Sequence, residues 1–239
     1  MTNNSFDVLF LLARPGAGKS EVIDFLKNLA PDRRRSEFHL DNLGELDDFP
    51  MLWTWFEEDD IRQSMGKARV HSTPEYYFKE PYQWDLLIRR LGLDYQKILR
   101  DNQDYHKDHS LLVEFARGSQ HGGFKRAFEH LSKDLIKRSA ILYIDVSWEE
   151  SLRKNRKRFN PDKPDSILEH GLEDEKLEFL YKESDWQEIA PGESGTIDIQ
   201  GVKVPYAVMD NHDDVTSTGG EVLAERLKSS MDVLFNLMA

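Results

Sequence analysis

The chain has 239 residues, a formal net charge of −12 and no cysteine. This length suits one domain with insertions, and the lack of cysteine excludes disulfides and thiolate metal sites. No apolar run approaches the ~18 residues of a membrane span, residues 1–5 lack a basic signal-peptide start, and the acidic balance argues against broad nucleic-acid binding. We therefore expect a cytoplasmic protein with no membrane partner.

The first predicted elements are an apolar strand over 6–12, a glycine-rich turn and a helix over 19–29. The turn reads Ala-Arg-Pro-Gly-Ala-Gly-Lys-Ser over 13–20, which fits a phosphate-binding pattern with Ala13 where glycine is more usual. Glycines let the backbone direct N–H groups at phosphate oxygens, and the helix N-terminus adds positive potential. Strand, turn and helix together favour a phosphate site over a turn that binds nothing.

The pattern also assigns a role to each position of the turn. Lys19 would reach the β- and γ-phosphates, and Ser20 would ligate Mg²⁺. The residues expected to hold the nucleotide phosphates are Arg14, Pro15, Gly16, Ala17, Gly18, Lys19 and Ser20.

Four more strands are predicted, over 37–40, 111–115, 140–146 and 206–210. Further helical patterns cover 83–101, 122–137, 149–158 and 219–237. Alternating strands and helices predict an α/β fold: a single domain, 1–239, with a five-stranded, mainly parallel sheet and helices on both faces. Ligands of such sheets bind beyond the carboxyl ends of the strands, so polar residues expected there are candidates: Asp41, Glu114, Asp145 and Asn211.

Two segments are longer than simple connections. Residues 44–110 are rich in aromatic side chains and predict a helical insertion on the substrate side; the aromatics either stack on a substrate base or pack a core. Residues 159–195 are polar, with a short helix expected near 173–183. The alternation over 196–204 around Gln-Gly predicts a small hairpin.

With these elements in order, the chain resembles P-loop kinases of small molecules, in particular the nucleoside and nucleotide kinases and the uridine-kinase-like group. The likeness is specific at 13–20 and moderate at three other points. It implies a P-loop NTPase three-layer sandwich with a lid, ATP and Mg²⁺ as cofactors, and phosphoryl transfer to a small-molecule acceptor such as a nucleoside or nucleotide.

The first two points are carboxylates. In the resembled kinases an Asp after the second strand accepts the substrate hydroxyl proton or helps to order Mg²⁺, which implies that role for Asp41. Glu114 ends the third predicted strand, where Mg²⁺ or a substrate hydroxyl would compensate its burial. The implied metal ligands are Ser20, Asp41 and Glu114, and Arg117 would contact substrate. The alternatives are a turn or cap for Asp41 and a structural arginine partner for Glu114.

The third point is the basic run at 153–158, where five of six residues are Arg or Lys. In the resembled kinases such a helix belongs to a lid, here 151–190. Arg153 and Arg156 would then meet the transferring phosphoryl group and Arg158 the nucleotide. The alternative is a solvated helix face. The resemblance also places the 211–216 loop, with Asn211, against the adenine ring; an ordinary turn is the alternative.

The sequence leaves two alternative functions open. A GTPase is suggested by Asp41-Asn42-Leu43-Gly44, but the sequence has no Asn-Lys-x-Asp guanine motif. A kinase of a macromolecular or toxin-type target is the other. The acceptor, the choice between ATP and GTP, the catalytic base and the oligomeric state are left open.

Overall fold

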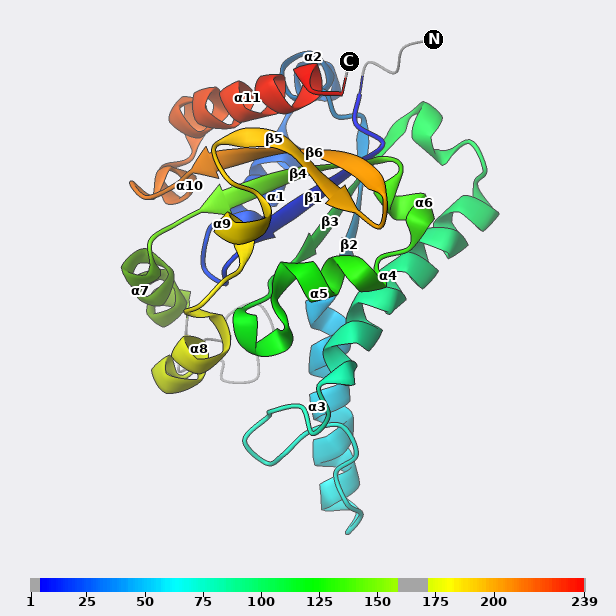
Figure 1. The fold of residues 1–239 in the computed structure, drawn as a ribbon, viewed down its shortest axis with the longest axis vertical. Helices are drawn as coiled ribbons and strands as arrows, with labels where there is room; N and C mark the ends of the chain where they lie inside the picture. Colours follow the sequence, from blue (N-terminus) through cyan, green and yellow to red (C-terminus); the bar gives the residue numbers. More distant parts are fainter. Residues whose placement is uncertain (1–4, 159–171, 239) are drawn as a thin grey trace.

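A computed structural model of the protein describes residues 5–158 and 172–238, the side chain of Arg158 excepted. Six strands form one sheet in the order β2-β3-β1-β4-β6-β5 (Figure 1). Five run parallel and β5 is antiparallel to β6. The strands are β1 (Val8–Ala13), β2 (Asn42–Asp47), β3 (His109–Phe115), β4 (Ser139–Asp145), β5 (Ser194–Ile199) and β6 (Val202–Asp210).

The mainly parallel α/β sheet is thus confirmed, but the expected number of five strands is wrong. The hairpin predicted over 196–204 exists, and its second strand continues without a break through the strand predicted at 206–210. Its first strand, β5, therefore joins the main sheet as a sixth, antiparallel edge strand.

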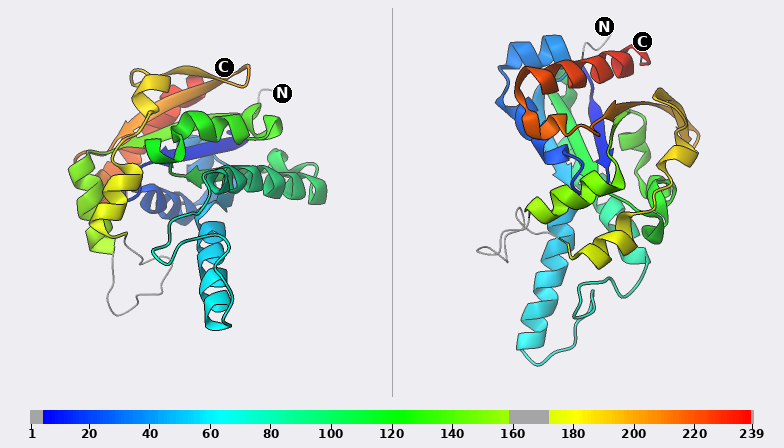
Figure 2. Two further views of the ribbon diagram at one scale, coloured as in Figure 1. Left: turned by 60° about the horizontal axis from the view of Figure 1, so that its bottom comes forward. Right: turned by 90° about the vertical axis from the view of Figure 1, so that its left-hand side faces the viewer.

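Both faces of the sheet are covered, and successive side chains of β1 point into different cores. Leu9 and Leu11 pack in one core, whereas Phe10 and Leu12 pack in the other. Helices α1 (Lys19–Asn28), α2 (Pro31–Phe38) and α11 (Gly220–Asn236) complete the first core. The second core is completed by α4 (Tyr82–Asp101), α5 (Gly123–His130), α6 (Lys133–Ile136) and α9 (Trp186–Ile189). Figure 2 shows these helices on opposite sides of the sheet.

The strand predicted at 37–40 is wrong. Helix α2 continues through Phe38, and His39 ends it in the left-handed conformation with φ 55°. The alternation of Phe38 and Leu40 suggests a strand, but Phe38 is buried from the last helical turn. Strand β2 begins only at Asn42, so Asp41 precedes the strand and Asp47 ends it.

The insertion between β2 and β3 has its own structure. Helix α3 (Phe49–Ser64) projects away from the sheet, and the chain returns along it before α4 begins (Figures 1 and 2). Buried Asp59 accepts hydrogen bonds from the amides of Val70, His71 and Ser72, which ties the returning loop to the helix. Aromatic side chains from both segments pack around Leu52, Phe56 and Leu87.

The remaining helices are short. They are η1 (Tyr105–Lys107), η2 (Ser119–His121), α7 (Trp148–Arg158), α8 (Asp174–Tyr181) and α10 (Val215–Thr218). The helix expected near 173–183 is confirmed by α8. The helix predicted over 122–137 is divided, because Leu131 and Ser132 adopt extended conformations between α5 and α6. No helix in the described part of the chain is both long and apolar enough to cross a membrane.

Candidate active site

The loop between β1 and α1 packs tightly on its surroundings. Gly16 (φ 72°) and Gly18 (φ 103°) both adopt left-handed conformations that glycine tolerates best. A Cβ at Gly18 would lie 2.3 Å from the Thr216 hydroxyl oxygen, and one at Gly16 would lie 2.9 Å from the Ser151 carbonyl oxygen. The loop therefore needs glycine at both positions to pass between α7 and α10.

Buried side chains support the same loop from below. The Asn211 amide donates to the carbonyl oxygen of Ala17 at 2.9 Å, and its oxygen accepts from the Thr216 amide at 3.1 Å. The Ser151 hydroxyl donates to the Pro15 carbonyl at 2.8 Å. Asn211 thus lies beneath the loop and fixes its backbone. The expected adenine contact of the 211–216 loop stays a prediction.

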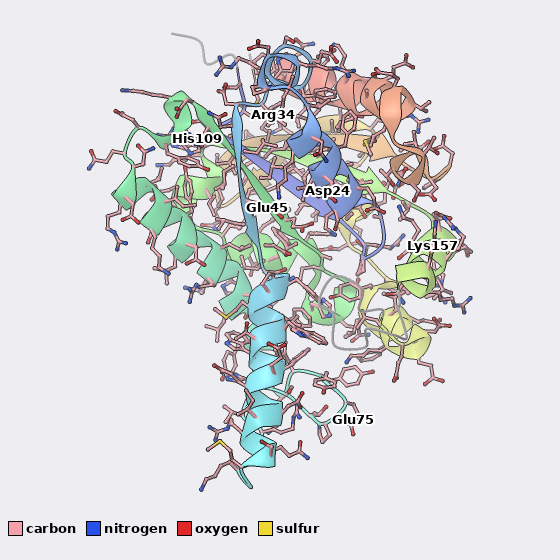
Figure 3. The ribbon with its side chains drawn as sticks, turned by 180° about the vertical axis from the view of Figure 1, so that it is seen from behind. Asp24, Arg34, Glu45, Glu75, His109 and Lys157 are labelled. Atoms are coloured by element: carbon pink, nitrogen blue, oxygen red, sulfur yellow. The ribbon has the colours of Figure 1, made fainter. Side chains whose placement is uncertain are left out.

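The first-turn amides of α1 have no intrahelical acceptor and, with the helix dipole, suit an anion. This helix end borders a cleft of about 380 Å³, which Lys19 and Ser20 line. The opposite wall comes from the carboxyl ends of β2 and β3, including Glu45, Asp47 and Glu114. Figure 3, which views the molecule from behind, shows Glu45 on β2 beside Asp24 on α1.

Two carboxyl groups meet in this wall. Asp47 and Glu114 occupy paired positions on the parallel strands β2 and β3, so their carboxyl groups lie close enough to influence each other's protonation. Only 8% of Glu114 is exposed. Two neighbouring carboxylates repel each other, which favours retention of one proton by the pair beside the ammonium of Lys19.

The surroundings of the pair explain this proton. Burial raises the pKa of Asp47 to about 8, with added contributions from the negative charges of Glu114 and Asp48, while Lys19 counteracts them. Burial also raises the pKa of Glu114, and the Lys19 ammonium again opposes the shift. A cation entering beside this pair would favour loss of the retained proton.

Asp41 lies elsewhere, contrary to the expectation. Its carboxylate accepts a hydrogen bond from Ser5 at 2.5 Å and pairs with Arg35, and its amide donates to the Ser110 hydroxyl. Ser110 is near the start of β3, so Asp41 sits at the opposite end of the sheet from Glu114. The cause is the misplaced second strand: the carboxylate that ends β2 is Asp47. Consecutive carboxylates directly after Leu46 were the available sequence signal.

Arg117 reaches the cleft as expected and has an unforeseen partner. Its guanidinium pairs with Asp48 at 2.6 Å and lies 5.1 Å from the Trp84 ring centroid. Both charged side chains are buried, Arg117 with 2% exposure. The pair joins the carboxyl end of β3 to the start of α3, so the insertion is fixed to the cleft by a buried ionic contact.

The basic helix α7 directs Arg153 and Arg156 away from the cleft. Arg153 pairs with Glu150 and Asp214, both at 2.6 Å, and exposed Arg156 pairs with Asp174 at 2.5 Å. Neither lines the cleft. The side chain of Arg158 lies outside the described part of the structure.

Asn155 is the α7 residue that lines the cleft, and sequence reasoning missed it. It holds Leu172 through two hydrogen bonds, donating to the Leu172 carbonyl at 2.6 Å and accepting from its amide at 3.0 Å. Neighbouring Lys154 is buried and bonds to Asp214 and Thr216, behind the phosphate loop. The sequence shows only a run of positive charge here, which does not indicate that Asn155 and Lys154 make these specific contacts.

The described part of the expected lid, 172–190, packs on the body of the protein. Tyr181 and Trp186 are buried, and Arg14 donates to the Lys182 carbonyl at 3.1 Å. A Cβ at Gly118 would lie 1.9 Å from the Leu180 carbonyl oxygen, so this contact is too close for any other residue. Movement of 151–190 as one lid would have to break these contacts. Residues 159–171 lie outside the described residues.

A second cavity of about 230 Å³ adjoins the cleft. The two share a wall made by Phe49, Leu52, Trp84, Leu172 and Tyr181. Helix α3, the returning loop and α8 supply most of its other side chains, so part of the 44–110 insertion borders this cavity. Its expected role on the substrate side stays a prediction.

The donor set of the cleft bears on metal binding. The described residues contain no group of three His, Asp or Glu side chains placed to hold a metal ion. Mg²⁺ bound with a nucleotide needs only one or two protein oxygens, because phosphates and water supply the rest. Ser20, Asp47 and Glu114 provide oxygens of this kind on the walls of one cleft. They fit a nucleotide-borne Mg²⁺ and not a permanent metal site.

Comparison with known proteins adds little to this geometry. No protein-family model matches the chain, and no curated protein is similar to it in sequence. Among solved structures, an unliganded sugar kinase from Janibacter sp. HTCC2649 is 14% identical with a TM-score of 0.40, covering 97% of this chain and 98% of its own. A protein designated APE1195 is 13% identical with a TM-score of 0.41, covering 95% and 98%. These similarities are too low to decide the function, which rests on the site.

Proposed function

We propose that the protein is an ATP- and Mg²⁺-dependent phosphotransferase that acts on a hydroxyl group of a small-molecule acceptor. The observation that carries the proposal is the pairing of half-buried Asp47 with buried Glu114 beside Lys19, in the cleft that also receives the N-terminus of α1. Phosphoryl transfer needs this combination of anion-binding helix end, neutralising cation and carboxylate.

Each group has a part in this reaction. The loop 14–20 and the first amides of α1 would hold the nucleotide phosphates, with Lys19 neutralising charge on the β- and γ-phosphates. Ser20 and one carboxylate of the pair would contact Mg²⁺, which when bound supplies further charge neutralisation. The other carboxylate would orient the acceptor hydroxyl and take its proton, and we assign this role to Asp47 because its pKa of about 8 suits a base.

The second cavity favours transfer over simple hydrolysis. A nucleotide hydrolase requires only water at the γ-phosphate, whereas the cleft here adjoins a second cavity large enough for an organic molecule. Acceptor transfer is therefore preferred to a GTPase-like reaction.

The test is release of ADP from ATP by the full chain, with and without acceptor panels of nucleosides, nucleotides, sugars and aromatic alcohols. We expect acceptor-dependent release that Lys19→Ala abolishes and that Lys137→Ala, at an exposed position directly after α6, leaves unchanged. Nucleotide turnover that no acceptor accelerates, or full activity of Lys19→Ala, would contradict the proposal.

A further inference from the structure

The second cavity is enclosed mainly by aromatic rings. Rings from α3 and the returning loop, Trp53, Phe56, Tyr76 and Phe78 among them, form one side, and Phe179 on α8 closes another. A cavity of about 150 Å³ lined by apolar side chains holds benzene, so 230 Å³ accommodates a substituted ring. Aromatic walls favour a flat apolar group, because ring faces and edges pack closely against one another.

Three polar side chains of this cavity are already engaged. The Tyr76 hydroxyl donates to Asp60 at 2.8 Å, and Lys79 donates to the Arg69 carbonyl. Lys176 donates to the carbonyl oxygens of residues 75 and 76, at 2.6 and 2.9 Å. These groups have little hydrogen-bonding capacity left for a ligand.

His121 supplies a buried donor to the wall of this cavity. Its ring stacks on Trp84 with 3.8 Å between centroids, and only 5% of the residue is exposed. Burial, with a smaller contribution from the Arg117 charge, lowers the pKa of His121 to about 2, so the ring is neutral. The Gly118 amide donates to Nδ1, which places the ring proton on Nε2. Among the described residues, this buried Nε2–H has no acceptor.

We infer that the acceptor is an alcohol with a flat, largely apolar ring in the second cavity and one oxygen at the ring edge that accepts a hydrogen bond from His121 Nε2–H. The inference rests on the proposed function, because it assumes that the ligand of the second cavity is the phosphoryl acceptor. The hydroxyl group of this ligand must then extend past the shared wall to the Asp47–Glu114 pair. It narrows the acceptor to ring-bearing alcohols.

The same contacts disfavour two other classes of acceptor. A nucleobase has several polar edge atoms and a sugar has several hydroxyls, and each one buried here without a partner would cost binding free energy. The Lys176 ammonium, 4.6 Å from the centroid of the Tyr77 ring, also opposes a cationic ring. An uncharged ring with one oxygen satisfies the His121 donor and leaves few polar atoms of its own buried without a partner.

The probes for the test are two alcohols that differ at one group: 4-(2-hydroxyethyl)acetophenone, with a ring-edge ketone, and 2-(4-isopropylphenyl)ethanol, its isostere without the oxygen. Calorimetry on the full chain without nucleotide measures their affinities, with uridine and glucose as comparisons. We expect both ring alcohols to bind more tightly than uridine and glucose. The ketone should be favoured by about 3- to 10-fold, the value of one hydrogen bond.

His121→Phe keeps a stacked ring and removes the donor, so the ketone should lose its advantage while the isopropyl probe still binds. The ratio of the two affinities within one variant is insensitive to a loss of stability. His109→Phe is the matched control, because His109 lies at the start of β3 (Figure 3), outside both cavities, and should keep the ratio. A ketone advantage that survives in His121→Phe overturns the inference.

The wild-type protein alone also decides the matter. If uridine or glucose binds more tightly than both ring alcohols, the inferred acceptor class is wrong, even if ATP-dependent transfer to that ligand proves the proposed function right. If the ring alcohols bind with the expected ratio but no acceptor stimulates ADP release, the cavity assignment stands and the proposed function fails.

Discussion

Asp47 and Glu114 are direct neighbours across the adjacent parallel strands β2 and β3. Burial and the negative charge of Glu114 together raise the pKa of Asp47 to about 8, so the pair favours retention of a proton. The pair sits where parallel α/β sheets bind their ligands, beyond the carboxyl ends of the strands. Its chemistry therefore governs how the site responds to mutation and to pH.

Asp47→Asn keeps the shape of the side chain and removes its ability to accept a proton. We expect kcat to fall about 10²- to 10⁴-fold, the usual loss of a general base, with a much smaller change in ATP affinity. Steady-state turnover and calorimetric nucleotide binding measure the two effects. Asp134→Asn, at an exposed position on α6, is the control. If Glu114→Gln gives this pattern and Asp47→Asn does not, the roles of the two carboxylates are reversed.

The pH dependence of kcat/KM follows from the same residue. Asp47 must be unprotonated to act as a base, and its pKa in the free protein is raised to about 8. We therefore expect kcat/KM to rise about tenfold per pH unit below pH 8 and to level off above it. Asp47→Asn should remove this limb from its residual activity. A profile that is flat from pH 6 to 9 would show that Asp47 is not the base.

Stability should have the opposite pH trend around this pair. In the unfolded chain Asp47 loses its proton near pH 4, whereas in the folded protein it keeps the proton to about pH 8. Between these values the folded state binds more protons, so the free energy of unfolding falls as pH rises. Asp47→Asn removes the effect and should be more stable than wild type at pH 8. Even one unit of retained shift corresponds to about 1.4 kcal/mol. Denaturant unfolding at pH 5 and pH 8 measures the difference, which should be larger at pH 8.

The buried pair of Arg117 and Asp48 gives a separate stability prediction. Asp48→Asn leaves the Arg117 guanidinium buried without a counter-ion, which typically costs about 3–5 kcal/mol. The double variant Asp48→Asn with Arg117→Met removes the charge as well and should recover part of the loss. Chemical denaturation measures both. If the double variant is no more stable than Asp48→Asn alone, the unpaired charge is not the cause.

Much of the fold and the glycine-rich loop between β1 and α1 could be predicted because their signals are local. Gly16, Gly18 and Lys19 belong to one contiguous motif, and the unbroken apolar run of β1 predicts its burial. Asp47 was missed because the second strand was predicted over 37–40, which made Asp41 the carboxylate at its end, whereas β2 runs from Asn42 to Asp47. Phe38 and Leu40 alternate like strand residues, and only the packing of α2 shows otherwise.

The sequence could not show which way α7 faces. Successive residues on a helix point about 100° apart, so a basic run alone does not tell which member turns to the cleft. Nothing in the sequence pointed to His121. Its role as a donor depends on the Gly118 amide, which places the ring proton on Nε2, and on burial against Trp84, and both arise only from the fold.

Neighbouring residues on α7 provide the last prediction. Arg156 is exposed and paired with Asp174, whereas Asn155 lines the cleft and holds Leu172, which belongs to the wall that both cavities share. We expect Arg156→Ala to change kcat/KM less than about 2-fold, because an exposed ion pair contributes only about 0–1 kcal/mol.

Asn155→Ala removes both hydrogen bonds to Leu172, at about 0.5–1.5 kcal/mol each, and loosens the shared wall. Its main effect should be a higher KM for the acceptor, with the KM for ATP little changed. Steady-state kinetics with each substrate varied in turn separates these constants. If Arg156→Ala loses much of its kcat while the kinetic constants of Asn155→Ala are unchanged, Arg156 rather than Asn155 acts in the reaction, at the transferring phosphoryl group.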